Sequence, residues 1–131
     1  MNRVVLDASA GVEIALQSPD GLQLESLIPR GAVAWVPEHY FVEVSGVIRR
    51  RELSGQTPAP LAQIALDRLL ASPVQIVSVQ PLISEAWTMR NNLTIADALY
   101  VVIALHIDAP LVTTDLKLAG APNLPVDTIT L

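Results

Sequence analysis

Residues 94–105 are apolar on almost every side of an expected helix, and they carry a single carboxylate, Asp97, in its first turn. A helix of this composition belongs deep inside a core, because it has no polar face to turn toward water. A buried or half-buried carboxylate is unfavourable unless it is paired, hydrogen-bonded or bound to a cation. The rest of the chain must therefore cover this helix and supply a partner for Asp97.

The composition is typical of a protein with a large core and excludes several classes of function. With 131 residues, 51% of them hydrophobic, we expect a single domain over 1–131. No apolar run reaches membrane-spanning length without a proline, glycine or charge, so we expect no membrane partner. No secretory leader is expected and cysteine is absent, which together favour a cytoplasmic protein. The net charge of -5 argues against a protein that coats polyanions, but allows an enzyme that meets nucleic acid through bound cations.

Short apolar strands alternate with helices along the chain, which predicts an α/β fold with a mainly parallel sheet. The helix at 60–71 is expected to turn Leu61, Ile64, Ala65 and Leu69 toward the core. Strands are expected over 1–6, 32–36, 75–79, 111–113 and 126–129, and helices over 10–17, 22–28, 39–53, 60–71, 81–92 and 94–105.

Four carboxylates occupy positions that such a fold would bring toward one edge of the sheet. Asp7 and Asp115 follow strands, Asp97 opens a helix, and Glu43 lies in an apolar helical segment. In parallel sheets, ligands bind beyond the carboxyl ends of the strands. Each acid also has a simpler explanation: Asp7 and Asp115 as helix N-caps, Asp97 as part of a capping box with Thr94, and Glu43 as a solvated residue.

Taken together, the four acids predict a cation site. Carboxylates about 4 Å apart repel by on the order of 4 kcal/mol at an effective dielectric constant of about 20, so a cluster of them needs cations. Ligands that are all oxygen favour Mg²⁺ or Mn²⁺ over Zn²⁺. Such a site suits phosphodiester hydrolysis, in which a metal activates water and stabilises charge on the transferring phosphoryl group.

Several neighbouring polar residues have two interpretations. Three hydroxyl residues are either ordinary residues of a helix start or a strand end, or hydrogen-bond partners of the acids or of a metal-bound water. They are Ser9, Thr113 and Thr114. A basic run is either a solvated helix end or a contact for a phosphate backbone; it consists of Arg49, Arg50 and Arg51. His39 stands four residues before Glu43 and is interpreted as a polar residue of the first helical turn.

Four segments together resemble the motifs of PIN domains, in the same order. They are residues 4–10, Glu43 on its helix, residues 94–100 and residues 111–118. The size of the chain, without added domains, resembles the VapC toxins of bacterial and archaeal toxin–antitoxin pairs.

The resemblance implies a three-layer α/β/α fold with about five strands and a Mg²⁺- or Mn²⁺-dependent endoribonuclease. Asp7, Glu43, Asp97 and Asp115 would be both its catalytic residues and its metal ligands, and its substrate would be an RNA such as tRNA or rRNA. It also implies a homodimer that a VapB-like antitoxin inhibits by occluding the acidic pocket, in a heterotetramer or larger assembly.

Two other classes remain open from the residues alone. A phosphoacceptor signalling domain also places carboxylates at the strand edge of an α/β sheet, but here Glu43 lies within a helix and Asp97 opens one. A non-catalytic α/β interaction module would use the acids only as helix caps.

Overall fold

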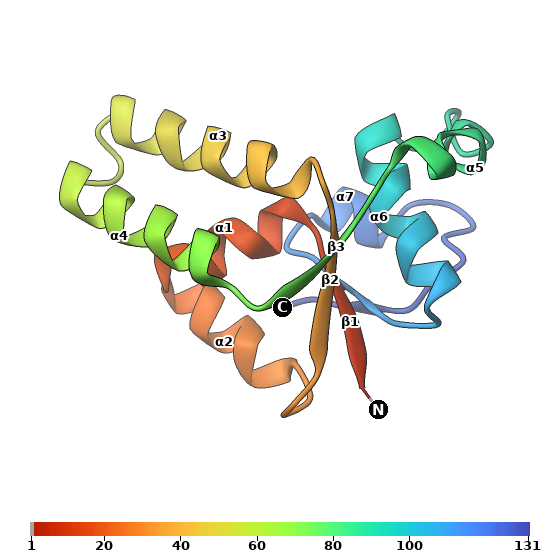
Figure 1. The fold of residues 1–131 in the computed structure, drawn as a ribbon, viewed down its shortest axis with the longest axis horizontal. Helices are drawn as coiled ribbons and strands as arrows, with labels where there is room; N and C mark the ends of the chain where they lie inside the picture. Colours follow the sequence, from red (N-terminus) through yellow and green to blue (C-terminus); the bar gives the residue numbers. More distant parts are fainter. Residues whose placement is uncertain (1) are drawn as a thin grey trace.

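A five-stranded parallel sheet forms the centre of the computed structural model, which describes residues 2–131 (Figure 1). Strand β1 lies in the middle of the order β3–β2–β1–β4–β5, and all four pairings are parallel. The strands are β1 (Arg3–Leu6), β2 (Val33–Pro37), β3 (Val74–Val77), β4 (Leu111–Val112) and β5 (Thr128–Ile129).

Helices cover both faces of the sheet, as the three-layer α/β/α prediction requires. Helices α1 (Ala8–Leu16), α2 (Pro19–Leu27), α3 (Tyr40–Leu53) and α4 (Ala59–Ala71) pack together on the left of Figure 1. Helices α5 (Ile83–Trp87) and α6 (Ile95–His106) pack together on the right. A 3₁₀ turn, η1 (Gln80–Leu82), leads into α5, and α7 (Leu116–Ala119) follows β4.

Helix α6 is buried from two sides, which explains why its sequence is apolar all round. Part of it packs into the main core beside β1, β2 and β4, and part packs against Ala86 of α5. The α6 residues in the main core are Tyr100, Val101, Ile103 and Ala104, and those that pack against α5 are Ala98, Leu99 and Val102. Among residues 2–131, no helix combines the length and the apolar character that crossing a membrane requires.

Two helices differ from the prediction by three residues or more because of local hydrogen bonding. Helix α2 begins at Pro19 rather than at residue 22, since the Ser18 hydroxyl accepts the N–H of Gly21 and proline suits the first helical position. Helix α5 ends at Trp87 rather than at residues 91–92, because the next amides bond to carbonyls three residues back, as in Met89 N–H to Ala86 O at 3.0 Å.

The prediction for the buried face of α4 was right for Ala65 and Leu69 and wrong for Leu61 and Ile64. Leu61 and Ile64 are 54% and 44% exposed, whereas Ala62, Ala65 and Leu69 are buried. Helix α4 lies against both α1 and α3, and the alanine face allows these helices to approach closely. The larger side chains one position away therefore remain at the surface.

The packing of α1 against α2 depends on Gly21, and this predicts the effect of a single methyl group. In Gly21→Ala, the new Cβ would overlap the backbone carbonyl of Glu13, which cannot rotate away. We expect a loss of about 1–3 kcal/mol in the free energy of unfolding, measured by urea denaturation.

The matched control is Gly46→Ala in α3, where the nearest atom to a new Cβ is Arg50 Nη1 at 3.8 Å. This variant is expected to gain about 0.5–1 kcal/mol, because alanine favours a helix over glycine. Equal unfolding midpoints for the two variants would contradict this account of the α1–α2 contact.

Candidate functional site

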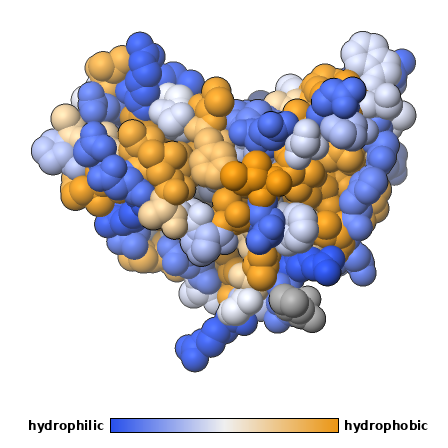
Figure 2. Space-filling model, in the orientation of Figure 1, coloured by the Kyte–Doolittle hydropathy of each residue, from blue (hydrophilic) through white to orange (hydrophobic). Residues whose placement is uncertain are grey.

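The site lies at the carboxyl edge of the sheet, where β1 and β4 end side by side. Leu6 is paired with Val112, and the N–H of Asp7 donates to the carbonyl of Val112 at 3.1 Å. This pairing places Asp7 next to the segment that contains Thr113 and Asp115. It is the upper edge in Figure 1, and Figure 2 shows the molecule hollowed there, between the α3 side and the α5–α6 side.

Asp7 is an almost fully buried carboxylate, with 4% of its surface exposed. Its Oδ1 accepts hydrogen bonds from the Ser9 hydroxyl at 2.7 Å and from the Ala10 N–H at 2.9 Å, so it also caps α1. Its Oδ2 accepts from the Thr113 hydroxyl at 2.5 Å. Burial raises the pKa of Asp7, and these three donors oppose that rise.

Two hydroxyl groups join the segments that carry Asp7 and Asp115. The fully buried Thr113 hydroxyl donates to Asp7 and accepts the N–H of Asp115 at 2.9 Å. The Ser9 hydroxyl donates to Asp7 and accepts the N–H of Thr114 at 2.9 Å. The hydroxyl of Thr114 makes no hydrogen bond among the described residues, so this residue acts through its backbone.

Asp115 is half-buried and begins α7. Its Oδ1 accepts the N–H groups of Lys117 at 3.0 Å and Leu118 at 3.2 Å, as an N-cap does. Within residues 2–131, Oδ2 has no hydrogen-bond donor, and it remains available for another ligand.

Glu43 is tied to the buried helix α6 by Tyr100. The Tyr100 hydroxyl donates to Glu43 Oε1 at 2.7 Å, and His39 Nε2 lies 3.4 Å from the same oxygen. Burial and the charge of Glu43 raise the pKa of Tyr100, which keeps the phenol protonated as a donor. The His39 ring packs edge-on against Tyr100 with centroids 5.1 Å apart, and its Nε2 is buried without a hydrogen-bond partner.

Sequence reasoning missed Tyr100 as a residue of the site. Two features of the sequence could have identified it. Tyr100 stands three residues after Asp97, which puts both side chains on one side of the helix. It is also the one hydroxyl group between residues 95 and 105.

Asp97 faces the other acids from the first turn of α6. Thr94 caps the helix by accepting the N–H of Asp97 at 3.1 Å, so no backbone N–H of the first turn needs the Asp97 carboxylate as its acceptor. Burial raises the pKa of Asp97, the charges of Asp115 and Glu43 raise it further, and Thr94 and His39 lower it. The charge of Asp97 in turn raises the pKa of Asp7. The four acids therefore share one electrostatic environment.

The residues fit a hard divalent cation in their chemistry, although they are not gathered round one point. Among the described residues, no three carboxylate or imidazole groups already converge as a metal site. Instead, hydroxyl donors hold Asp7 and Glu43 separately: Ser9 and Thr113 donate to Asp7, and Tyr100 donates to Glu43. The candidate ligands are nearly all carboxylate oxygens, which hard divalent cations prefer, and their charges repel one another. The Nε2 atom of His39, which has no hydrogen-bond partner, lies beside Glu43.

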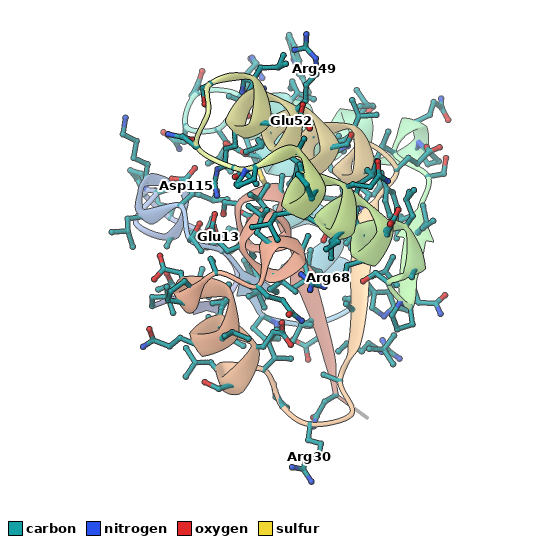
Figure 3. All side chains as sticks on the ribbon, turned by 90° about the vertical axis from the view of Figure 1, so that its left-hand side faces the viewer. Glu13, Arg30, Arg49, Glu52, Arg68 and Asp115 are labelled. Carbon is teal, nitrogen blue, oxygen red and sulfur yellow. The ribbon has the colours of Figure 1, made fainter. Side chains whose placement is uncertain are left out.

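The structure separates the three arginines of the basic run. Arg51 is bound to Glu13 of α1 at 2.7 Å, and it joins α3 to α1. Arg49 is exposed and projects away from the body of the molecule in Figure 3. Arg50 is exposed on a different side of α3.

Comparisons with known proteins agree with this architecture. Residues 4–124 match the model of the PIN domain family. The chain is 36% identical to Ribonuclease VapC1 of Mycobacterium tuberculosis, over 97% of this chain and 96% of that protein. It is 34% identical to Ribonuclease VapC12 of the same organism, over 88% of this chain and 89% of that protein.

Solved structures share the fold at low sequence identity. VapBC2 from Rickettsia felis, bound to a fragment of its promoter DNA, superposes with a TM-score of 0.67 at 16% identity, over 98% of both chains. Mycobacterium tuberculosis VapC20, a toxin that cleaves the sarcin–ricin loop, gives the same TM-score and identity over 90% of this chain and 95% of that one. The matches do not favour a signalling domain or an interaction module.

Thr113→Val tests the link between the two acid-bearing segments. Valine keeps the shape but leaves the Asp115 N–H without its acceptor and removes one of the three donors to Asp7. We therefore expect a loss of about 1–3 kcal/mol in the free energy of unfolding at neutral pH. Part of this loss should shrink as the pH falls through the raised pKa of Asp7, because a protonated carboxyl needs the donor less. Thr114→Val, which removes a hydroxyl without hydrogen bonds, is the control for urea denaturation at each pH; equal losses at both positions would refute the link.

Tyr100→Phe tests the anchor of Glu43. Losing a hydrogen bond to a charged group should lower the free energy of unfolding by about 1–2 kcal/mol. Tyr40→Phe is the control: Tyr40 is also a buried side chain, but its hydroxyl makes no hydrogen bond within residues 2–131, so its removal should be close to neutral. Thermal denaturation of both variants decides the matter, and a neutral Tyr100→Phe would show that this hydrogen bond does not hold Glu43.

Proposed function

This chain belongs to the PIN domain family, within its VapC group, and we propose that it is a Mg²⁺- or Mn²⁺-dependent endoribonuclease that acts as the toxin of a toxin–antitoxin pair. The observation that carries the proposal is the placement of the four acids at the carboxyl edge, where Thr113 links Asp7 to the Asp115 segment, Tyr100 of α6 holds Glu43, and the charge of Asp97 is coupled to the other three. Such coupling is unfavourable in the free protein and becomes useful when a cation is bound.

Asp7, Glu43, Asp97 and Asp115 would hold the cation. In such a site a divalent cation lowers the pKa of a bound water and neutralises charge on a transferring phosphoryl group. The chain itself orients the carboxylates. Ser9 and Thr113 hold both oxygens of Asp7, and Tyr100 holds one oxygen of Glu43.

Capping supports this role of the acids and does not compete with it. Asp7 and Asp115 each use Oδ1 to cap a helix, which fixes the carboxylate relative to the backbone. Asp97 does not cap its helix, because the Thr94 hydroxyl is the N-cap acceptor of α6. A rigid ligand loses less entropy when it binds a cation, so fixed carboxylates favour binding.

The partner we propose is a VapB-like antitoxin. The structural neighbours include a VapBC2 assembly from Rickettsia felis and a toxin–antitoxin complex from Klebsiella pneumoniae, the latter with a TM-score of 0.58. The acids are buried or half-buried at the hollowed edge in Figure 2, and such a hollow suits inhibition by a segment that covers it. We further propose that the toxin is a homodimer, as the family resemblance implies.

Asp7→Asn and Asp97→Asn should each lower RNA cleavage by more than about 100-fold, because replacing even an outer partner of a metal ligand costs about 10–100-fold. Both variants should also relieve growth arrest on expression. Asp67→Asn, on the exposed side of α4, is the control. Full toxicity of both site variants would refute the assignment.

The same variants have a readout that does not depend on cleavage. Mn²⁺ should raise the melting temperature of the wild type and of Asp67→Asn but not that of Asp97→Asn. Without metal, Asp97→Asn should be the more stable protein at neutral pH, because the native environment disfavours the charged carboxylate. This advantage should vanish as the pH falls through the raised pKa of Asp97, where the wild-type carboxyl becomes neutral.

A further inference from the structure

The cations of this protein are few, and most of them have a structural task or lie far from the acids. The chain has eight lysines and arginines. Arg51 binds Glu13, Arg68 donates to the carbonyl of Ala15 at 2.9 Å, Arg90 stacks on Trp87 at 4.9 Å, and Arg3 lies over Trp35 at 6.0 Å. Arg30 projects from the loop at the opposite edge of the sheet (Figure 3). The cations left near the carboxyl edge are Arg49, Arg50 and Lys117.

Arg50 lies on the same face of α3 as Glu43. Glu43, Gly46 and Arg50 are separated by three and then four residues, which places them in one row along a helix. Long helical side chains point back toward the helix N-terminus. Arg50 does so: its Nη1 lies 3.8 Å from the position that a Cβ on Gly46 would take, one turn closer to Glu43 than its own backbone.

Arg49 does not share this row. It borders a pocket between α3 and α4 together with Glu52 and Gln63, and its side chain points outward in Figure 3. Neither Arg49 nor Arg50 forms an ion pair within residues 2–131. The two residues therefore have the same chemistry and the same helix but face different surroundings.

Gly46 has no structural reason to be a glycine. Its φ is not in the left-handed region, and a Cβ would meet only the mobile end of Arg50 at ordinary contact distance. A glycine inside a helix costs about 0.5–1 kcal/mol relative to alanine. The residue leaves a bare stretch of helix between the carboxylate of Glu43 and the guanidinium of Arg50.

We propose that Arg50 binds a backbone phosphate of the RNA strand that Glu43 and the other acids cleave, and that the bare surface at Gly46 lets the strand pass close to α3. The proposal rests on the proposed function. A guanidinium binds phosphate through two parallel hydrogen bonds, which suits this task. An acidic edge in a protein of net charge -5 repels RNA, so a free cation on the approach has a direct effect on binding.

The test compares Arg50→Gln with Arg49→Gln, which remove the same charge from neighbouring positions. The probe is a fluorescein-labelled single-stranded RNA oligonucleotide of mixed sequence, and binding to the full chain is measured by fluorescence anisotropy in EDTA, where cleavage plays no part. We expect Arg50→Gln to weaken binding about fivefold, the effect of one exposed charge contact, and to lower the slope of log Kd against log salt by about 0.7. Arg49→Gln should keep the wild-type slope.

Gly46→Leu is a second variant, and its melting temperature separates a folding defect from a binding defect. Leucine favours a helix over glycine, so the melting temperature should rise while RNA binding weakens. If either Arg50→Gln or Gly46→Leu binds the oligonucleotide as tightly as Arg49→Gln, the proposal is overturned. This is also the result expected if Arg50 binds a protein partner instead of RNA. If instead the proposed nuclease function is wrong, the wild type will not cleave RNA with Mg²⁺, while the differences in RNA binding between the variants in EDTA will remain.

Discussion

The buried hydrogen bond between Thr113 and Asp7 connects residues that are 106 positions apart, and the candidate site depends on it. It forms because β1 and β4 are neighbours in a parallel sheet, so both strands end at the same edge. A carboxylate as buried as Asp7 would be costly without donors. Thr113, Ser9 and the first turn of α1 supply three of them, and the Thr113 hydroxyl also receives the N–H of Asp115.

Helix α6 provides the opposite wall of the site and the rigidity behind it. Its apolar surface is covered by the sheet on one side and by α5 on the other, so Asp97 and Tyr100 are held by a helix that cannot shift without exposing core residues. Tyr100 extends this rigidity to α3 through Glu43. Acids that repel one another are thereby kept at a common edge by packing rather than by mutual attraction.

Much of this arrangement could be predicted because it depends on local sequence. An acid after a buried strand must lie at the carboxyl edge, and an all-apolar helix must be buried, whatever its neighbours are. The predictions failed where the answer depended on a neighbouring element. Leu61 and Ile64 of α4 fit a helical apolar row equally well, yet α1 and α3 select the alanine face; likewise, Ser18 and Pro19 resemble a helix break but start α2.

The sequence by itself determined the alternation of strands and helices, the positions of the four acids and the burial of α6, since these follow from periodicity and from residue chemistry along the chain. Only the tertiary structure decided which side chains hold the acids and which surroundings each arginine of the basic run faces. Arg49, Arg50 and Arg51 are equivalent in sequence, but each successive residue turns about 100° around a helix. That rotation turns Arg51 toward Glu13 of α1, Arg49 outward and Arg50 along the face of Glu43.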